Sequence, residues 1–403
     1  MSAAELNGWL ARLESLHPEE IELGLDRVAE VAGRLSVLQA ACPVVTVAGT
    51  NGKGSTVAVI EALALHAGKS VGSYTSPHLL RYNERVRLNG LPVSDATLVD
   101  AFTAVESARG QVPLTYFEFG TLAALAIFRQ AAPQLVILEV GLGGRLDAVN
   151  IIDPDVAVIT SISEDHQSWL GTDRETIGRE KAGILRTGIK AVIADPDPPV
   201  TVIEALTALQ CDYSLHDHAA AALLQSGPLR PENVAGALKV ADHLGFMPPA
   251  DEVSALLAEL RLPGRLQQLR VADRRVIVDV AHNPAAVANL ADWLEKCAPG
   301  RCFALFAALS DKDIHAMIRA CQGCFSGWYL TALPEVPRAL EVGQLASILD
   351  SCGVEAVVSC ENPAAAWQRA QAETDEADTL VIFGSFYTVA GFLQCLEEEQ
   401  AKA

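Results

Sequence analysis

A short apolar run that leads directly into a glycine-rich loop constrains this chain more than any other stretch. Residues 44–47, Val-Val-Thr-Val, predict a buried strand. Residues 49–55, Gly-Thr-Asn-Gly-Lys-Gly-Ser, permit a tight turn and a close approach of the backbone to a ligand. Residues 57–66 follow with a helical pattern. A strand, a glycine-rich loop and a helix N-terminus in this order predict a phosphate-binding site.

The loop contains the side chains that a bound nucleotide requires. Lys53 supplies positive charge for the β- and γ-phosphates, and the hydroxyl of Ser55 or Thr56 can reach Mg²⁺. The spacing departs from the common GxxxxGK[ST] loop, because Val47 occupies the position of its first glycine. The flanking strand and helix argue against a flexible loop with an incidental lysine. We expect ATP to contact Thr50, Asn51, Gly52, Lys53, Gly54 and Ser55.

Composition and charge narrow the function classes. The chain has 403 residues, of which 50% are hydrophobic and 20% charged, as in a globular protein of two or three domains. Its net charge of −20 argues against non-specific nucleic-acid binding, which relies on a basic surface. An anionic substrate must therefore be met by a local basic site.

The sequence indicates neither a membrane protein nor a secreted one. No apolar run has the length that a bilayer requires, and the acidic N-terminus lacks the features of a secretion signal. The odd number of cysteines, nine, fits a reducing compartment. For the lone pair Cys321 and Cys324, ordinary burial is favoured over redox or metal chemistry. We expect a cytoplasmic monomer that binds neither membranes nor nucleic acid.

Apolar runs and helical patterns alternate along the chain, which predicts an α/β fold with mainly parallel sheets. Helices are expected at 94–108, about 115–130 and 173–186 and throughout 199–261, and Asn89-Gly90 indicates a turn. The expected strands cover residues 44–47, 69–75, 135–140, 156–161, 191–194, 266–272, 275–280, 302–308, 327–332 and 379–384.

A proline and a glycine mark the best candidate domain boundary, at Leu262-Pro-Gly-Arg265. It separates a predicted P-loop domain, residues 1–262, from a smaller Rossmann-like α/β domain, residues 263–403. Ligands of such sheets bind at the carboxyl ends of the strands.

Polar residues lie at several of these strand ends, where the phosphate loop also lies. Ser76 follows one strand, Glu139 lies inside an apolar one, and His166 follows a third. Because a carboxylate in an apolar strand is costly unless it is paired or bound to metal, these residues predict a Mg²⁺ site. The alternatives are an ion pair of Glu139 with Arg145 and a solvated loop position for His166. For Lys181, the residues alone favour a cation on a helix face.

In the second domain, Asp279 ends an expected strand and precedes a turn, so it is a candidate site residue. Arg265, in the linker, either reaches the same cleft or acts only as a hinge residue. In the first case ATP would lie between the domains, and domain closure would exclude water from a reactive phosphate intermediate.

Several motifs occur together and in order. They are Ala48-Gly-Thr-Asn-Gly-Lys-Gly-Ser55, Ser76-Pro-His-Leu79, Glu139-Val-Gly-Leu-Gly-Gly-Arg-Leu-Asp147, Arg179-Glu-Lys-Ala-Gly-Ile184, Leu262-Pro-Gly-Arg265, Asp279-Val-Ala-His-Asn-Pro284 and Gly384-Ser-Phe386. With them the chain resembles the folylpolyglutamate synthase/dihydrofolate synthase family, relatives of the Mur peptide ligases, over nearly its whole length. The Tyr-Phe-Glu form of residues 116–118 and the early loop at 21–27 resemble the bifunctional bacterial members.

The resemblance implies a Mur-ligase-like P-loop domain and a C-terminal glutamate-ligase domain. It implies ATP-dependent ligation of a carboxylate to the amine of L-glutamate, through an acyl phosphate, with ADP and phosphate released. Mg²⁺ would be bound by Ser76, Glu139, His166 and Lys181, the lysine being carboxylated to a carbamate. This would replace the helix-face interpretation of Lys181.

The resemblance also assigns substrate contacts. Lys53, His166 and Lys181 would be catalytic, and ATP would further contact Asn233, Arg265 and Asp279. The pteroate end would be held by Glu22, Leu23, Thr115, Tyr116, Phe117, Glu118, Leu146, Asp147 and Ala148. For the glutamate pocket the candidates are Asp311, Lys312, Asp313, His315 and Ser385, and for a general base His282 or His315.

The favoured function is therefore a bifunctional ligase that adds L-glutamate to 7,8-dihydropteroate and to the glutamyl tail of reduced folates. The alternatives are an enzyme with only the polyglutamate-extending activity, a Mur-type ligase, and a nucleotide-dependent switch that uses the P-loop without ligation. The Mur-type alternative is weakened because no N-terminal UDP-sugar domain is recognisable. The switch is weakened because it needs no second-domain site.

Overall fold

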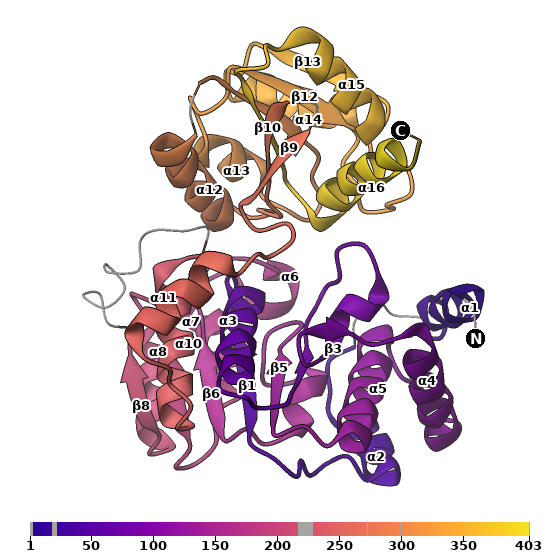
Figure 1. Ribbon diagram of the computed structural model, residues 1–403, viewed down its shortest axis with the longest axis vertical. Coiled ribbons are helices and arrows are strands. Elements are labelled where there is room, and N and C mark those ends of the chain that lie inside the picture. Colours follow the sequence, from indigo (N-terminus) through magenta and orange to yellow (C-terminus); the bar gives the residue numbers. More distant parts are fainter. Residues whose placement is uncertain (1–2, 18–21, 217–228, 272, 299, 403) are drawn as a thin grey trace. The chain divides into compact units, whose positions relative to one another are not determined.

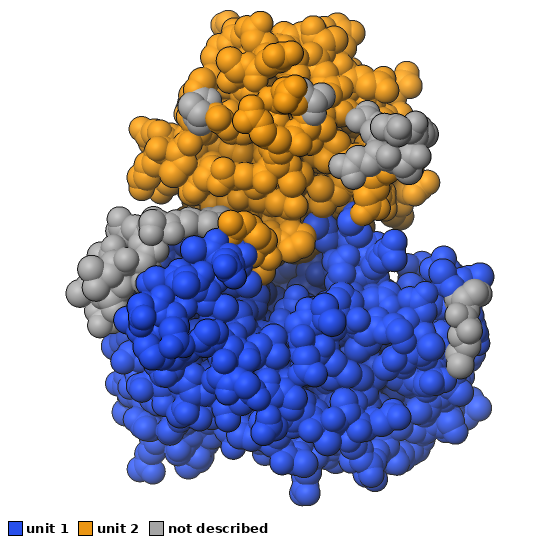
Figure 2. Space-filling model, in the orientation of Figure 1, with its two compact units in different colours: residues 1–260 blue, residues 261–403 orange. Residues whose placement is uncertain are grey.

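The computed structural model describes residues 3–17, 22–216, 229–271, 273–298 and 300–402 (Figure 1). Ile21, the first residue of the early loop, therefore lies outside the described residues. The chain divides into two compact units, Met1–Leu260 and Arg261–Ala403, which Figure 2 shows in different colours. No helix in the described part of the chain has the length and apolar character to cross a membrane.

The first unit is built on an eight-stranded sheet in the order β4-β3-β2-β5-β1-β6-β7-β8. Its pairs are parallel except for β2 with β3 and β3 with β4. The strands are β1 Val44–Ala48, β2 Val71–Tyr74, β3 Val86–Leu88, β4 Leu91–Pro92, β5 Leu135–Glu139, β6 Val156–Ile159, β7 Lys190–Ile193 and β8 Asp212–Leu215.

Helices cover both faces of this sheet (Figure 1). The α-helices are α1 Ala3–Glu14, α2 Asp26–Leu35, α3 Lys53–His66, α4 Asp95–Arg109, α5 Tyr116–Ala131, α6 Gln167–Leu170, α7 Arg174–Ala182, α8 Val200–Ala208, α10 Pro231–His243 and α11 Ala250–Glu259. Two 3₁₀ turns are η1 Tyr82–Arg85 and η2 Ala148–Ile151. Because both faces are covered, every residue of β1 and β5 is buried, Glu139 included.

The second unit has a six-stranded sheet in the order β13-β12-β11-β14-β10-β9, in which only β9 runs antiparallel to its neighbour. Its core contains rings of Phe306, Trp328 and Phe383. The strands are β9 Gln267–Val271, β10 Arg274–Val278, β11 Cys302–Phe306, β12 Gly327–Thr331, β13 Val357–Cys360 and β14 Thr379–Phe383. The helices are α12 Pro284–Cys297, α13 Ile314–Ala320, α14 Val342–Ser351, α15 Pro363–Glu373 and α16 Phe386–Lys402.

The predicted α/β class with mainly parallel sheets is confirmed. The expectation of helices throughout 199–261 is wrong at β8, and part of that range, 217–228, lies outside the described residues. Asp212–Leu215 lies at the edge of the sheet and three of its four residues are exposed, so it lacks the apolar run of a buried strand. For β13, Val357–Cys360, no residue is fully buried, and the sequence analysis missed this strand too.

A buried polar group ties the helix after the phosphate loop to the sheet. Glu61, on α3, accepts a hydrogen bond from the Ser73 hydroxyl at 2.7 Å and pairs with Arg87 at 2.6 Å. Arg87 Nε also donates to the Ser73 hydroxyl at 3.3 Å. These contacts join α3, β2 and β3, and so fix the helix that begins at the phosphate loop against the strand that leads to Ser76.

Replacing Arg87 by alanine should destabilise the first unit by about 3 kcal/mol, because it leaves the Glu61 carboxylate buried and unpaired. The measurement is urea unfolding followed by pulsed hydrogen exchange in peptides from residues 71–88. Arg12→Ala is the matched control. It removes an exposed ion pair with Glu106 and should cost about 1 kcal/mol or less. If Arg87→Ala and Arg12→Ala lowered the free energy of unfolding equally, the buried network would not be stabilising.

Candidate active site

The phosphate loop follows β1, and α3 begins within it at Lys53. Gly52, just before the helix, has φ 91°, a conformation that favours glycine. A Cβ at this position would lie only 2.4 Å from Nδ2 of Asn233. Asn233 is buried in the first turn of α10, which packs against α3. The structure therefore places Asn233 directly against the loop.

The end of β6 clamps the other side of the loop. The Thr50 amide donates to the Ser161 carbonyl at 2.7 Å, and the Thr160 hydroxyl donates to the Asn51 carbonyl at 2.8 Å. A Cβ on Gly49 would lie 1.7 Å from the Thr160 hydroxyl, so only glycine fits there. The sequence analysis did not single out Thr160 and Ser161. Their place at the end of an apolar strand could have identified them as candidates.

Two lysines share one carbonyl of the loop. The Gly49 carbonyl oxygen accepts hydrogen bonds from Lys53 Nζ at 3.1 Å and from Lys181 Nζ at 2.9 Å. Lys53 Nζ also lies 3.2 Å from the Thr50 carbonyl oxygen. Lys181 is only 3% exposed, so its interpretation as a cation on a helix face is wrong.

Electrostatics lower the proton affinity of Lys181. Burial, and then the positive charge of Lys53, lower the pKa of Lys181 from 10.5 to about 7, although Asp165 and Asp147 oppose the change. Burial raises the pKa of Asp147 from 3.8 to about 6, against the effect of backbone N–H groups and of Lys53. These effects favour the neutral amine of Lys181 more than in an exposed lysine.

Glu139 lies at the end of β5, beside both the loop and Ser76. Its Oε2 accepts the Ser76 amide at 3.2 Å, and a Cβ on Gly54 would lie 3.6 Å from the same oxygen. Arg145 instead binds Glu180, at 2.9 Å, so the alternative of a Glu139–Arg145 ion pair is wrong. This 4%-exposed carboxylate, beside the start of α3, would be a suitable ligand for a divalent cation.

His166 is the residue that precedes α6. It has φ 52°, and its amide donates to its neighbour Asp165 at 2.8 Å. It is partly buried. Asp165 is one of the charges that act on Lys181, so the His166 turn and Lys181 belong to the same site. Asp165 was not singled out in the sequence.

A modified Lys181 would make the donor set more suitable for Mg²⁺. No group of three or more His, Cys, Asp and Glu side chains in the described ranges is arranged to hold a metal. The predicted set contains only two such residues, Glu139 and His166. Ser76 adds a hydroxyl, and a carbamate on Lys181 would add the anionic oxygens that this cation prefers. Thr56 donates its hydroxyl to Gly52 at 3.0 Å and is fully buried, which favours Ser55 as the loop hydroxyl.

The early loop and the start of α5 meet through one arginine. Arg27 pairs with Glu22 and, at 3.0 Å, with Glu118. Glu118 also accepts the Thr115 amide at 2.8 Å, while Thr115 caps the helix. Leu23 is partly buried in the same loop. The structure thus brings together two of the three segments expected to hold the pteroate end.

The third segment lies beside the same helix. A Cβ on Gly141 would lie 2.6 Å from the Phe117 ring, so the chain after β5 passes directly beneath it. Asp147 accepts the amides of Leu142 and Val149, at 2.8 and 3.0 Å. The neighbours of Asp147 differ in exposure, since Leu146 is partly exposed and Ala148 buried. Tyr116 packs instead against the Tyr82 ring.

In the second unit, Asp279 organises the residues after β10. Its two carboxylate oxygens accept the amides of Leu266 and Ala281, both at 2.8 Å. Burial raises its pKa, and Arg265 opposes the rise. The Arg265 guanidinium lies 5.0 Å from the centre of the Phe386 ring. Arg265 and Asp279 are therefore neighbours, and Asp279 has a clear structural role besides any contact with ATP.

The glutamate-pocket candidates of the second unit have mixed roles. Asp313 accepts the Ala316 amide at 2.9 Å and Ser385 accepts the Thr388 amide at 3.0 Å, so both cap helices. Lys312 pairs with Asp311 at 3.6 Å, and His315 is exposed on α13. Nδ1 of His282 lies 2.9 Å from the Val280 carbonyl oxygen, which favours a proton on Nδ1.

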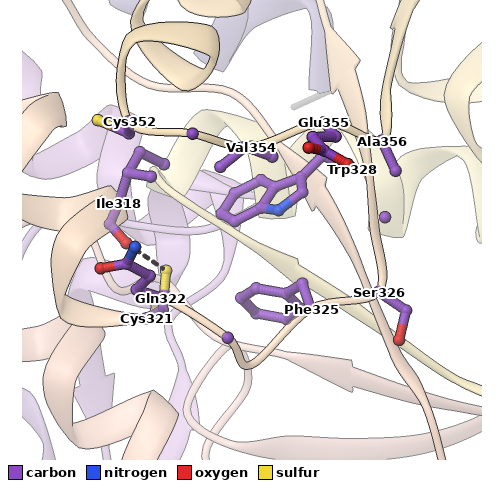
Figure 3. Close-up of a pocket in the computed structure, with 13 residues that line it drawn as sticks. Ile318, Cys321, Gln322, Phe325, Ser326, Trp328, Cys352, Val354, Glu355 and Ala356 are labelled. Atoms are coloured by element: carbon purple, nitrogen blue, oxygen red, sulfur yellow. Dashed lines mark hydrogen bonds between the residues drawn. The ribbon is translucent and has the colours of Figure 1, made fainter.

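A cavity of about 330 Å³ in the second unit is lined by none of these residues (Figure 3). Phe325, Trp328 and Cys321 line it, near the amino end of β12 and thus away from the carboxyl edge. The Cys321 thiol donates to Ile318 at 3.6 Å, as Figure 3 shows, and burial raises its pKa to about 12. These are properties of an ordinary buried thiol.

Comparison with known proteins is consistent with this geometry. Residues 47–227 match the Mur ligase middle domain, and residues 264–386 match the Mur ligase, glutamate ligase domain. The chain is 42% identical to dihydrofolate synthase/folylpolyglutamate synthase of Escherichia coli, over 99% of this chain and 97% of that protein.

Solved structures agree. E. coli FolC in complex with DHPP and ADP has a TM-score of 0.90 and 40% identity and covers 99% of each chain. The bifunctional folylpolyglutamate synthase/dihydrofolate synthase with Mn, AMPPNP and L-glutamate bound has a TM-score of 0.88 and 43% identity, over 97% of this chain and 98% of that one. The chain therefore belongs to the dihydrofolate synthase/folylpolyglutamate synthase family.

Proposed function

We propose that this protein is an ATP- and Mg²⁺-dependent ligase that adds L-glutamate to 7,8-dihydropteroate and to the glutamyl tail of reduced folates. The observation that carries the proposal is the pair of lysines, Lys53 and Lys181, on the Gly49 carbonyl of a phosphate loop, with the Glu139 carboxylate beside the loop. A relative that is 42% identical over nearly the whole chain has both activities in its name.

The residues of the first unit fit the nucleotide and the metal. The loop from Thr50 to Ser55 and Asn233 would hold ATP, and Arg265 and Asp279 of the second unit would add contacts. Ser76, Glu139, His166 and a carboxylated Lys181 would hold Mg²⁺. When bound, the metal supplies Lewis-acid stabilisation of the charge that develops on the transferring phosphoryl group.

The side chains of the protein then have distinct tasks. A carboxylate is a poor electrophile, so the reaction activates it as an acyl phosphate before the amine of glutamate attacks and phosphate leaves. When ATP binds, Lys53 exchanges its hydrogen bonds with the Gly49 and Thr50 carbonyl oxygens for contacts with phosphate oxygens. It then stabilises the negative charge of the phosphate. His282 and His315 are the candidates for the base that takes the proton of the amine.

The two parts of the chain bind different substrates in this proposal. Residues 1–262 bind ATP, residues 263–403 bind glutamate, and the protein acts as a cytoplasmic monomer. The pteroate end is held by Glu22 and Leu23, by residues 115–118 and by residues 146–148. The contacts of Arg27 with Glu22 and Glu118 support this, since they join two of these segments.

An enzyme with only the polyglutamate-extending activity is the second candidate. The folylpolyglutamate synthase of Mycobacterium tuberculosis complexed with ADP is 29% identical over 98% of each chain, with a TM-score of 0.86. The same fold thus occurs in a protein named for one activity. Only an assay of both substrates separates the two candidates.

With ATP, Mg²⁺ and L-glutamate, the purified protein should convert dihydropteroate to dihydrofolate and should lengthen the tail of tetrahydrofolate. Mass spectrometry of the products measures both reactions. Each reaction should release one ADP for each glutamate that is added. A preparation that extends tetrahydrofolate and leaves dihydropteroate unchanged would favour the second candidate. ADP release without any glutamylated product would favour a nucleotide-dependent switch.

Lys53→Ala should lower the rate of both reactions by at least about 100-fold, because it removes a charge that stabilises the transferring phosphoryl group. The circular dichroism spectrum should match that of the wild type, since Lys53 is only partly buried. Lys239→Ala, an exposed lysine on α10, is the control and should keep full activity. Substantial turnover by Lys53→Ala would show that this loop does not bind the reacting phosphates.

Lys181 should carry a carbamate, because only the neutral amine reacts with CO₂ and the site lowers the pKa of this lysine to about 7. At fixed dissolved CO₂, modification should therefore rise with pH through about 7, whereas a lysine of pKa 10.5 would stay charged. Carbon-13 NMR with labelled bicarbonate measures it. The carbamate signal should vanish in Lys181→Arg and persist in the control Lys190→Arg.

Activity gives a second test of the same site. Lys181→Ala should be nearly inactive and partly rescued by short-chain carboxylic acids, which replace the missing anion. Lys181→Arg should also be inactive, because its guanidinium keeps the positive charge and cannot be carboxylated. A fully active arginine variant, or a labelled carbamate that survives in it, would exclude the modification.

A further inference from the structure

Three arginines lie close together in residues 81–87, and their surroundings differ. Arg81 is exposed. Arg87 is paired with Glu61 at 2.6 Å. Arg85, on η1, is only 8% exposed, and no carboxylate in the described part of the chain forms an ion pair with it. A buried guanidinium without a counter-charge is costly, so its presence calls for a physical reason.

Neutral groups surround the Arg85 side chain. Its Nε donates to Nδ1 of His78 at 2.8 Å. Its guanidinium carbon lies 5.3 Å from the centre of the Tyr82 ring and 5.5 Å from that of Tyr116. Nδ1 of His78 thus accepts the hydrogen bond of Arg85 and adds no counter-charge. The aromatic faces and the imidazole offset part of the cost of burial and leave the positive charge in place.

The nearest acid along the chain has other partners. Glu84 accepts the amides of Leu79 at 2.7 Å, Leu80 at 2.9 Å and Arg81 at 2.7 Å. Its carboxylate therefore holds the turn after Ser76 and does not pair with the Arg85 guanidinium.

The residues around Arg85 indicate which anion its guanidinium could bind. The Arg85 carbonyl accepts the amide of Thr75, the residue before the expected metal ligand Ser76, at 2.8 Å. Tyr116, whose ring lies 5.5 Å from the guanidinium, belongs to a segment expected to hold the pteroate end. Arg85 thus lies near both the expected metal ligand and the expected folate site, and a planar guanidinium is suited to a carboxylate.

The reacting carboxylate already has a cation of its own. It must reach the phosphate loop, where Lys53 lies. A glutamylated folate brings a second carboxylate, the α-carboxylate of its terminal residue, a few bonds from the γ-carboxylate that reacts. Dihydropteroate has no such group.

We propose that Arg85 binds the α-carboxylate of the glutamyl tail of the folate substrate, and so serves the extension reaction selectively. The proposal rests on the proposed function, because it needs a substrate that carries this tail. Arg85 is then a specificity residue for one of two substrates that share the same reacting centre.

The test compares two substrates in one variant. Arg85→Gln should raise the KM for tetrahydrofolate by about 10- to 100-fold, as for the loss of a charged hydrogen bond. In the same variant, the KM values for dihydropteroate and ATP should change by less than about threefold. Arg81→Gln is the matched control, and both of its KM values should equal those of the wild type. Titration calorimetry with tetrahydrofolate should show the same loss of affinity in Arg85→Gln alone.

Arg85→Lys keeps the charge and loses the fork of the guanidinium, so the KM for tetrahydrofolate should lie between those of the wild type and Arg85→Gln. If Arg85→Gln does not fold, as judged by circular dichroism, the selective effect should still appear in Arg85→Lys. An equal rise of both KM values, or an unchanged KM for tetrahydrofolate, would overturn the proposal. A wild-type protein that glutamylates neither substrate would instead refute the proposed function.

Discussion

The parallel pairing of β1 with a strand on each side is the constraint on which the site depends. Val47 is in register with Glu139 of β5, and Ala48 with Ile159 of β6. Since parallel strands end at the same edge, the phosphate loop, the Glu139 carboxylate and the hydroxyl of Thr160 must meet there. The loop is therefore held by backbone geometry before any ligand arrives, and a one-residue shift in either pairing would separate the groups.

Within this frame, burial and like-charge repulsion set the chemistry. The Gly49 carbonyl accepts from both Lys53 and Lys181, and two ammonium groups at one buried oxygen repel each other. The more buried lysine, Lys181, is the one whose pKa is lowered to about 7. Either change, phosphate binding by Lys53 or conversion of Lys181 to an anion, would relieve this repulsion.

The sequence predicted features that depend on near neighbours along the chain. The phosphate loop, Ser76 and Glu139 could be proposed as site residues because each follows or ends an apolar strand, and the structure places the three near one another. The surroundings of Lys181 were not predictable, since its partner Gly49 is 132 residues away. Arg85 could not be told from Arg81 and Arg87 either, because burial and ion pairing depend on side chains from other elements.

Asn233 lies so close to Gly52 that any Cβ there would collide with it. The helix that bears Asn233, α10, comes after the last strand of the same sheet. The phosphate loop is therefore not a transplantable module. Residues 48–55 could be grafted into another scaffold or expressed in a fragment that stops before α10. In both cases the motif would remain, but the contact between Asn233 and Gly52 would be lost. Engineering of nucleotide specificity here would have to vary the loop and α10 together.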